Sequence, residues 1–487
     1  MRKRGSHAGS HVRSHAGSHV RSHAGPHVRS HAGPHVRSHV VAALAGTVAL
    51  SLLTAGCGGQ GSSSASSSSR TVTYWLWDAN QLPGYQACAK AFEERNPGVK
   101  VEITQLGWEN YWTKLTASMI AGTEPDVFTD HITKFAQFVD LDVLAPLDEL
   151  PATAGIKDSD YQAGLAASWK GQDGHRYGAP KDWDTIAMFY NKKMTDSAGI
   201  SADTLNSLAW NPQDGGTFEK AIARLTVDSK GRRGDEPGFD KNDVKIYGLA
   251  TNDAGEADGQ TQWSAFTGSA GWKYTDQKAW GRHYNYDQKS FQSTIDWYFG
   301  LAEKGYLAPF KNFSQSNGPE VQVGSGSAAI ALHGSWMAKT FYGMKGLDAG
   351  TALTPVGPSG KRATMMNGLA DSLTKRAADK PAAQKWVAYL ASDACQTTVG
   401  KQGVVFPATE AGTAAAIAAY EKDGIDVTAF TKPVADGTTF PFPITDYAAD
   451  VAALMKPAMQ DVYANGRPVG SLTTTNRQIN LILSQGD

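Results

Sequence analysis

Cysteine, catalytic signatures and long apolar stretches are all scarce in this sequence of 487 residues. It contains three cysteines, Cys57, Cys88 and Cys395, so at most one internal disulfide can form. It shows no nucleophile elbow, zinc-protease helix motif or phosphate-binding loop, and its histidines beyond residue 131 lack metal-ligand spacing. After residue 56, no apolar stretch approaches the length of a membrane span. The sequence therefore predicts neither a cofactor nor a metal site.

The amino terminus has the features of an export signal. Residues 40–56 form an uncharged apolar run of the length found in a signal-peptide core, and the segment before it holds seven basic residues and no acidic ones. The run ends in Leu-Thr-Ala-Gly-Cys-Gly at residues 53–58, which resembles the lipobox of bacterial lipoproteins, although Thr54 departs from its usual leucine. We therefore expect a signal segment at 1–56, lipidation of Cys57 and a flexible Gly/Ser tether at 57–70. The alternative is an ordinary signal peptide with an incidental cysteine.

The first 40 residues repeat Ser-His-Ala-Gly-Ser-His-Val-Arg with a period of eight and carry nine of the 13 histidines. A metal-binding tract is conceivable for such a composition. It precedes the expected cleavage site, however, and would be discarded with the signal. We interpret the repeat as an over-extended start or a low-complexity segment and assign it no function.

Charge excludes two classes of partner for the exported part. Residues 1–56 hold seven of the 46 basic side chains and none of the 47 acidic ones, so the remainder has 39 basic and 47 acidic side chains, a net charge of −8. This balance argues against nucleic acid and anionic lipid as partners. All 13 tryptophans lie in the same part, which hints at a surface for flat, partly apolar rings.

Hydrophobic patterning predicts alternating strands and helices. Expected strands lie at 71–77, 99–103, 126–129 and 186–190, and expected helices at 83–95, 111–121, 135–141, 217–225, 292–305, 381–392, 414–422 and 447–464. This alternation favours an α/β fold with a mostly parallel sheet covered on both faces. The polar stretch 228–245 has scattered acids without the spacing of a calcium loop, and we interpret it as a solvated insertion.

Several short motifs occur together in a fixed order. They are Phe92–Val101, Trp112–Leu115 ahead of Ala121–Val127, Leu144–Leu150, Tyr177–Pro180 with Phe189–Lys192, Gly324–Ala329 ahead of Gly334–Trp336, and Gly403–Pro407. Each motif is weak alone, but the set resembles the family 1 extracellular solute-binding proteins, the sugar-binding receptors of ABC importers that include maltose-binding protein. The resemblance implies a type II periplasmic-binding-protein-like fold of two α/β lobes joined by crossing hinges. By analogy, lobe 1 spans 71–183 and 370–410, and lobe 2 spans 184–369 and 411–487.

Polar and aromatic residues are paired where expected strands enter the cleft between the lobes. Strand carboxyl ends and helix amino termini form the usual ligand site of open α/β sheets. The three pairs at successive strand ends are Trp77 with Asp78, Trp108 with Glu109, and Asp130 with His131. Tryptophan can cover the apolar face of a sugar, and the polar residues can bond its hydroxyls. A single tryptophan at a strand end would more often belong to the core.

The resemblance adds candidates from the two crossovers and from lobe 2. Asp182, Trp183 and Asp184 lie at the first crossover, where a solvated hinge loop is the alternative, and Asn367 and Gly368 lie at the second. Trp336 aligns with the tryptophan that stacks on sugar in the maltose-type receptors, and Trp263 could line the far wall or belong to the core. On this map Cys88 and Cys395 both fall in lobe 1, where they form a disulfide or remain as buried thiols.

The expected function is capture of a mono- or oligosaccharide in the interlobe cleft and delivery to the permease subunits of an ABC importer, without catalysis. The expected location is the extracellular face of the cell membrane, reached through the lipid anchor, with the protein acting as a monomer. Two rival hypotheses are an exported glycoside hydrolase and a cell-surface carbohydrate-binding scaffold. A hydrolase would need two carboxyl groups placed across one glycosidic bond, which sequence alone does not exclude.

Overall fold

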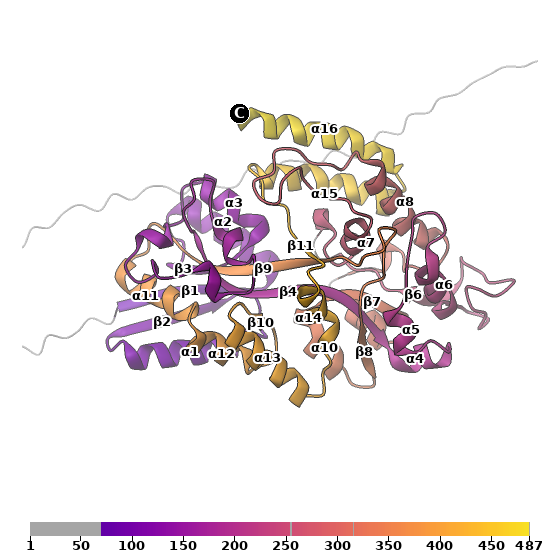
Figure 1. Ribbon diagram of the computed structural model, residues 1–487, viewed down its shortest axis with the longest axis horizontal. Helices are drawn as coiled ribbons and strands as arrows, with labels where there is room; N and C mark the ends of the chain where they lie inside the picture. The colour runs from indigo at the N-terminus through magenta and orange to yellow at the C-terminus, as the bar shows by residue number, and fades with distance from the viewer. Residues whose placement is uncertain (1–69, 254–255, 315, 487) are drawn as a thin grey trace, which may run out of the picture. The chain divides into compact units, whose positions relative to one another are not determined.

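The computed structural model describes residues 70–253, 256–314 and 316–486 (Figure 1). The expected signal segment, the histidine-rich repeat and Cys57 lie outside the described residues. Within the described part, no helix combines the length and apolar character needed to cross a membrane.

Eleven strands of the described chain form one extended sheet, in the order β2-β1-β3-β9-β4-β7-β6-β5, with β10 and β8 paired to β4 and β11 paired to β9. The strands are β1 (Arg70–Leu76), β2 (Val99–Gln105), β3 (Val127–His131), β4 (Gly178–Asn191), β5 (Val227–Asp228), β6 (Val244–Leu249), β7 (Ala328–Gly334), β8 (Ala349–Ala352), β9 (Thr364–Leu373), β10 (Phe406–Pro407) and β11 (Thr439–Pro441).

Two long strands, β4 and β9, connect the two ends of this sheet (Figure 1). The first half of β4, Gly178–Thr185, pairs antiparallel with β9, and its second half, Ile186–Asn191, pairs antiparallel with β7 and β8. A strand that serves both ends in this way is a crossing hinge. The prediction of two α/β lobes joined by crossing hinges is therefore confirmed, whereas the lobe boundaries remain a prediction.

The prediction of a mostly parallel sheet is wrong at the centre of the molecule. Strands β1, β2 and β3 do pair in parallel, and so do β6 and β7. However, β9 is antiparallel to both β3 and β4, and β4 is antiparallel to β7. The reason is topological: the chain enters lobe 2 along β4 and returns along β9, so these two strands run in opposite directions.

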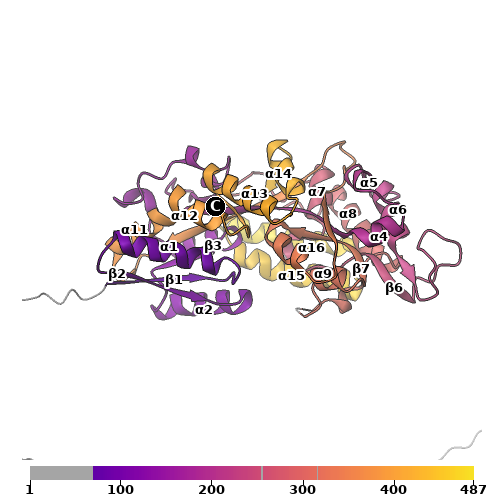
Figure 2. The same cartoon turned by 90° about the horizontal axis from the view of Figure 1, so that it is seen from below.

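Helices cover both faces of the sheet in each lobe, with α1, α11 and α12 grouped at one end and α4, α5 and α6 at the other (Figures 1 and 2). Their bounds are α1 (Leu82–Arg95), α2 (Trp108–Ala121), α3 (Ile132–Asp140), α4 (Lys192–Ser197), α5 (Ala202–Asn206), α6 (Gly216–Leu225), α7 (Ser264–Ser269), α8 (Lys289–Glu303), α9 (Pro319–Gly324), α10 (Ala338–Gly343), α11 (Lys380–Leu390), α12 (Asp393–Gly400), α13 (Glu410–Lys422), α14 (Thr428–Ala435), α15 (Ala448–Asn465) and α16 (Leu472–Leu483).

Local sequence explains where two site-forming helices begin and end. Helix α2 ends at Gly122, which adopts the left-handed conformation (φ 69°) that a residue without a Cβ reaches most easily. Helix α3 starts directly after His131, whose side chain accepts a hydrogen bond from the Thr133 amide and so caps the helix. The eight helices expected from hydrophobic patterning are all present, with ends shifted by up to four residues.

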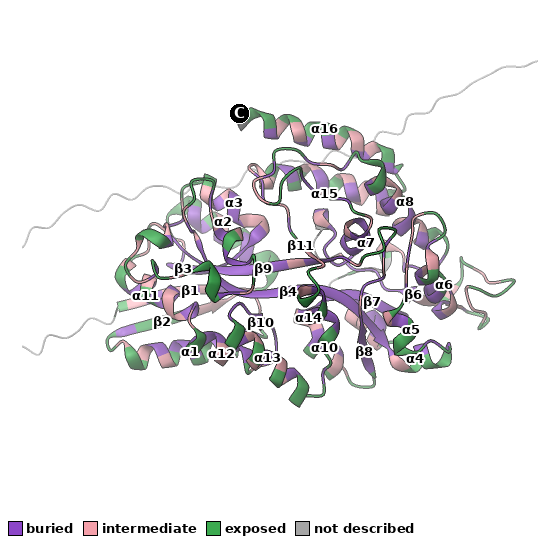
Figure 3. Ribbon diagram, in the orientation of Figure 1, coloured by how far each residue is buried: buried purple, intermediate pink, exposed green. Residues whose placement is uncertain are grey.

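Burial divides the interior into two apolar clusters, and each cluster draws on both lobes. One includes Phe128 and Phe135 together with Trp297, and the other includes Trp386 together with Phe341. Figure 3 shows the crossing strands buried along most of their length. Because β4 and β9 belong to the core of both lobes, side chains at their middle are held in fixed positions between the lobes.

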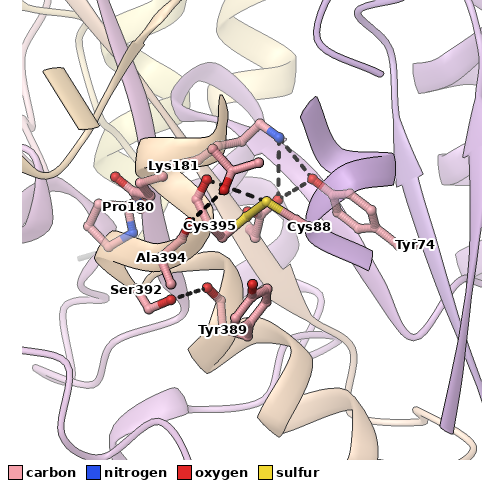
Figure 4. Close-up of a disulfide and its surroundings, with 11 residues drawn as sticks. Tyr74, Cys88, Pro180, Lys181, Tyr389, Ser392, Ala394 and Cys395 are labelled. Atoms are coloured by element: carbon pink, nitrogen blue, oxygen red, sulfur yellow. Dashed lines mark hydrogen bonds and ion pairs between the residues drawn. A yellow bond between two sulfur atoms is a disulfide. The ribbon is translucent and has the colours of Figure 1, made fainter. Parts of the chain in front are cut away.

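Cys88 and Cys395 form a disulfide, with Cα atoms 5.3 Å apart (Figure 4). Cys88 lies on α1, whereas Cys395 lies on α12, a helix separate from α11 that begins after Ser392. The bond ties the returning segment of lobe 1 to its first helix. Next to it, the side chain of Gln396 donates to the carbonyl of Pro180 on β4 (2.8 Å), so α12 also holds the crossing strand.

The acidic insertion at 228–245 is organised around one buried carboxylate. Asp228 accepts hydrogen bonds from the backbone amides of Lys230, Arg232 and Asp240, and from the Arg232 side chain. These bonds hold the pKa of Asp228 at about 2, below its ordinary value, even though its burial opposes ionisation. Within the described residues, no group of three or more His, Cys, Asp or Glu side chains is arranged to hold a metal ion.

Candidate functional site

An aromatic cluster lies at the carboxyl end of β1. The ring of Trp77, directly after that strand, meets the ring of Trp108 edge-on at a centroid distance of 5.1 Å, and Tyr111 and Trp112 pack beside it. Edge-to-face packing of this kind stabilises aromatic pairs beyond the area they bury. Trp108 remains 41% exposed, which makes it an unusually open tryptophan on an otherwise packed surface.

Three predicted residues lie within polar-contact distance of one another across three neighbouring strands. Asn367 on β9 lies opposite Asp184 on β4, and its amide nitrogen is 3.0 Å from the Asp184 carboxylate. The same nitrogen is 3.2 Å from Nε2 of His131, which ends β3. The His131 ring also contacts Trp77 and Trp108, so the polar chain and the aromatic cluster form one continuous site.

Two further residues complete this site, and sequence reasoning did not find them. Gln260, in the loop before α7, donates to the second oxygen of Asp184 at 3.1 Å. Phe442, just after β11, places its ring 5.6 Å from that of His131. Both residues lie in turn-rich segments without hydrophobic periodicity, so no pattern in the sequence distinguishes them.

Two acceptor oxygens at the crossing strands are buried without a hydrogen-bond partner. They are Oδ2 of Asp182 and Oδ1 of Asn367, on side chains that are 2% and 4% exposed. A buried acceptor left unpaired costs about 1–3 kcal/mol, so such atoms in a native fold call for an explanation. The Asn367 oxygen can only accept, and so can the Asp182 oxygen when its carboxyl group is ionised, so a ligand that donates hydrogen bonds, such as one bearing hydroxyls, fits them.

Burial shifts the ionisation of the site residues. It raises the pKa of Asp182 to about 7, with the neighbouring Lys181 ammonium acting in the opposite direction. Burial and the nearby Asp182 raise the pKa of Asp184 as well. Burial lowers the pKa of His131 to about 3, so this imidazole is neutral at physiological pH. The site therefore contains carboxyl groups and neutral rings without a cationic histidine.

Lys181 lies next to the two site carboxylates in sequence, but its side chain points into lobe 1 (Figure 4). Its ammonium donates to the Tyr74 hydroxyl (2.8 Å), lies 3.8 Å from Asp371 and sits 3.4 Å from the centroid of the Tyr85 ring. Such a buried cation is stabilised by its partners collectively. Lys181 therefore anchors the crossing strand to lobe 1, and the structure gives it no contact with the aromatic cluster.

The structure does not bring four of the predicted residues to this site. Trp183 points to the opposite face of β4 from Asp184, as strand alternation requires, and stacks on Phe406 with centroids 4.6 Å apart. Trp263 is fully buried in the core of lobe 2. Asp130 is buried in lobe 1, where it accepts from the His131 amide, and Gly368 lies against Leu165 so closely that a Cβ would clash.

The remaining predicted residues surround the site at its edges. Asp78 accepts from the Asn80 amide and the Gln81 side chain just after β1, and Glu109 is exposed on the first turn of α2. Trp336, on the lobe 2 side after β7, is half-buried with its ring 5.4 Å from that of His333. No contact joins Trp336 to the His131–Asn367–Asp184 chain among the described residues' hydrogen bonds and ring pairs.

Two α/β lobes connected by the antiparallel crossing strands β4 and β9 define the class of two-lobed substrate-binding proteins. Comparison with known sequences gives the family within that class. The chain belongs to the bacterial extracellular solute-binding proteins, whose family description matches residues 78–397. The resemblance found in the sequence motifs is therefore confirmed.

Individual relatives match shorter segments. The diacetylchitobiose binding protein DasA of Streptomyces coelicolor is 33% identical over 134 residues, 27% of this chain and 30% of that protein. The galactooligosaccharide-binding protein of Bacillus subtilis is 30% identical over 148 residues, 30% of this chain and 34% of that protein. The chain thus spans about a third of the length of these curated relatives.

Solved structures share the fold over nearly the whole described chain. The ABC substrate-binding protein of Listeria monocytogenes in complex with cycloalternan superposes with a TM-score of 0.71 at 17% identity, covering 85% of this chain and 99% of that one. UspC of Mycobacterium tuberculosis superposes with a TM-score of 0.65 at 22% identity, covering 86% and 100%. At these identities the superpositions establish the two-lobed fold.

Proposed function

We propose that this protein captures a sugar or short oligosaccharide between its lobes and delivers it to the permease subunits of an ABC importer. One observation carries the proposal: the exposed ring of Trp108 and the side chain of Asn367, with its unpaired buried oxygen, both adjoin His131. A sugar offers an apolar C–H face and a rim of donating hydroxyls, and these match the two kinds of surface in the site. Relatives that bind diacetylchitobiose and galactooligosaccharide support the same ligand class.

A neutral ligand fits this site better than an anionic one. Recognition of phosphate or carboxylate usually relies on arginine, and the site gathers Asp182, Asp184, Asn367 and Gln260 instead. The histidine among them is neutral. An anion would therefore meet carboxyl groups at the positions where the sugar hydroxyls are proposed to bind.

The proposal is tested by titrating the purified full chain with a panel of mono- and oligosaccharides that includes diacetylchitobiose, galactooligosaccharides and maltotriose. Thermal shift detects binding, and calorimetry measures its affinity. We expect one sugar class to raise the melting temperature and to be recovered intact by mass spectrometry. Cleaved product would favour the glycoside hydrolase instead, and no shift with any sugar would contradict sugar binding.

The site variant for this test is Asn367→Ala, which removes the free acceptor and one donor to Asp184. The matched control is Asn211→Ala, an asparagine that donates to Asp214 on an exposed loop of lobe 2. We expect the first to lose most of the sugar-induced shift and the second to keep it. Equal responses of the two variants would remove Asn367 from the ligand site.

We further propose that Cys57 carries the lipid anchor and that the mature chain acts as a monomer on the outer face of the membrane. The Leu-Thr-Ala-Gly-Cys sequence and the Gly/Ser segment after it support this. Two acyl chains on one residue suffice for stable anchoring. Wild-type protein should enter the detergent phase in a phase-partition experiment, and Cys57→Ser should stay in the aqueous phase. Wild-type protein found only in the aqueous phase would contradict the anchor.

A further inference from the structure

Two surface hairpins, one from each lobe, meet directly at the edge of α3. The lobe 1 hairpin is 170–176, closed by the bridge between Lys170 and Arg176, and the lobe 2 hairpin is 275–284, closed by the bridge between Thr275 and Tyr284. The indole nitrogen of Trp280 donates to the carbonyl of Lys170 at 3.1 Å. Trp280 thereby bonds backbone that belongs to the opposite lobe.

A second bond crosses between the lobes beside the first. The Gln172 side chain donates to the carboxylate of Asp446 at 2.7 Å, and Asp446 lies between β11 and α15 in the carboxyl-terminal part of lobe 2. The Gly281 amide donates to the Ile444 carbonyl at 3.0 Å, which ties the two lobe 2 segments together. The crossing contacts therefore act on one connected unit of lobe 2.

Backbone strain is concentrated in this unit. Of the three described residues other than glycine with positive φ, two belong to it: Trp280 (φ 53°) and Tyr447 (φ 54°). For bulky side chains this conformation is rare and persists only where surrounding contacts impose it. The Trp280 ring also packs 6.1 Å from that of Phe135 on α3, so contacts with lobe 1 contribute to holding the strained residue in place.

We propose that Gln172, Trp280 and Asp446 form an interlobe clasp that sets how often the two lobes separate. The clasp lies outside the His131–Asn367–Asp184 site, so it acts on ligand affinity through the balance between closed and open states. A ligand held between the lobes binds only the closed state tightly, and apparent affinity scales with the closed population. This goes beyond sugar capture, because the clasp would act on any ligand of the cleft.

The test uses hydrogen exchange of the full chain without ligand, so it does not depend on which ligand binds. Segments 280–284 and 442–446 report on lobe 2, whereas the substitution is made in lobe 1. Losing one side-chain hydrogen bond shifts an opening equilibrium roughly two- to tenfold. We expect Gln172→Ala to speed exchange of both segments by about that factor. Trp280→Phe, which keeps a ring but loses the donor, should speed exchange of 442–446.

A variant that adds a positive charge at residue 172 should change the exchange rates in the opposite direction. Gln172→Lys would face Asp446 and the nearby Asp140, whose pKa is raised by burial and by Asp446. We expect it to slow exchange of both segments at low salt and to lose this effect at high salt. The matched control, Asp214→Ala, removes the acceptor of an exposed bond from Asn211 within one lobe and should change neither segment.

Unchanged exchange in Gln172→Ala, or faster exchange in Gln172→Lys, would overturn the clasp. Small-angle scattering provides a second measurement on the Gln172→Ala/Trp280→Phe double variant. We expect its ligand-free radius of gyration to exceed that of wild type. A radius equal to that of wild type, together with accelerated exchange, would mean local fraying of the hairpins and would also overturn the proposal.

Discussion

Asn367 bonds Asp184 across the two crossing strands, with 3.0 Å between the amide nitrogen and the carboxylate oxygen. The pair lies where the chain passes from one lobe to the other. Asn367 also contacts His131 of lobe 1, and Asp184 also contacts Gln260 of lobe 2. A change in the angle between the lobes must alter these contacts. We therefore expect the proposed ligand binding to be coupled to hinge geometry at these two residues.

Replacing Asp184 tests that coupling. Asp184→Ala leaves the amides of Asn367 and Gln260 buried without their shared acceptor, so we expect unfolding free energy to fall by about 1–3 kcal/mol. Asp184→Asn keeps one acceptor oxygen, so its unfolding free energy should fall by less. Urea denaturation measures both variants. Equal stability of Asp184→Ala and wild type would show that the chain of bonds contributes nothing to the fold.

Two tryptophans separate ligand binding from stability. Trp108 is the exposed edge of the aromatic cluster, and Trp386 is fully buried beside Tyr74 and Phe92. Trp386→Ala should lower the free energy of unfolding by about 3–5 kcal/mol, as truncation of a buried aromatic does. Trp108→Ala should lower it by less than about 1.5 kcal/mol, because much of its surface is already in water. Thermal melts check both.

We expect the same two variants to differ in the opposite direction in their response to sugar. We expect Trp108→Ala to lose most of the sugar-induced thermal shift, and the surviving folded fraction of Trp386→Ala to keep it. A full sugar-induced thermal shift in Trp108→Ala would mean that the ligand binds elsewhere. Trp336, which the family resemblance favours, would then be the next candidate. Trp336→Ala is the corresponding variant on the lobe 2 side.

The disulfide makes a prediction about the returning segment of lobe 1. Cys88→Ala combined with Cys395→Ala should lower the free energy of unfolding by about 2–5 kcal/mol, the usual range for a native disulfide. In a Cys57→Ser background, a thiol assay on unfolded, unreduced protein should find no reactive thiol. Two reactive thiols would show that the cysteines are unpaired. Reducing agent should destabilise the wild type and leave the double variant unchanged.

The sequence predicted the order of elements in lobe 1 because strands β1 and β2 and helices α1 and α2 show clear hydrophobic periodicity and end signals such as Asn-Pro-Gly after Arg95. It did not predict the antiparallel centre of the sheet. Pairing between β4 and β9 joins residues about 185 positions apart, and no local pattern specifies such a partner.

The site was predictable to the extent that strand ends mark it. Trp77, Trp108, His131, Asp184 and Asn367 do come together, since the parallel strands β1, β2 and β3 end beside the middle of the crossing strands β4 and β9. Trp183 shows the limit of this reasoning: it lies between two acids in sequence, but the pleat sends alternate side chains to opposite faces, so Trp183 packs in the core. Loop residues such as Gln260 are placed only by tertiary structure.

The buried ionisable groups should make two opposing contributions to how the stability of the fold depends on pH. Burial raises the pKa of Asp130 to about 8, above its unfolded value near 4. The folded state then holds a proton that the unfolded state releases, so this contribution to stability is complete below about pH 4 and is lost as pH rises towards 8. Burial lowers the pKa of both His131 and His333 to about 3. Their contribution is complete above about pH 6.5 and is lost as pH falls towards 3.

The variant Asp130→Asn separates the two contributions, because it keeps the shape of the side chain and removes its charge. Its unfolding free energy should match that of wild type below about pH 4, where Asp130 is protonated in both the folded and the unfolded state, and exceed it at pH 8. Urea denaturation between these pH values measures the difference. A stability gap that is constant over this range would show that Asp130 ionises normally in the folded protein. A difference in unfolding free energy that shrinks as pH rises would be opposite to the expected trend. It would contradict the burial of a neutral Asp130 carboxyl group beneath the site.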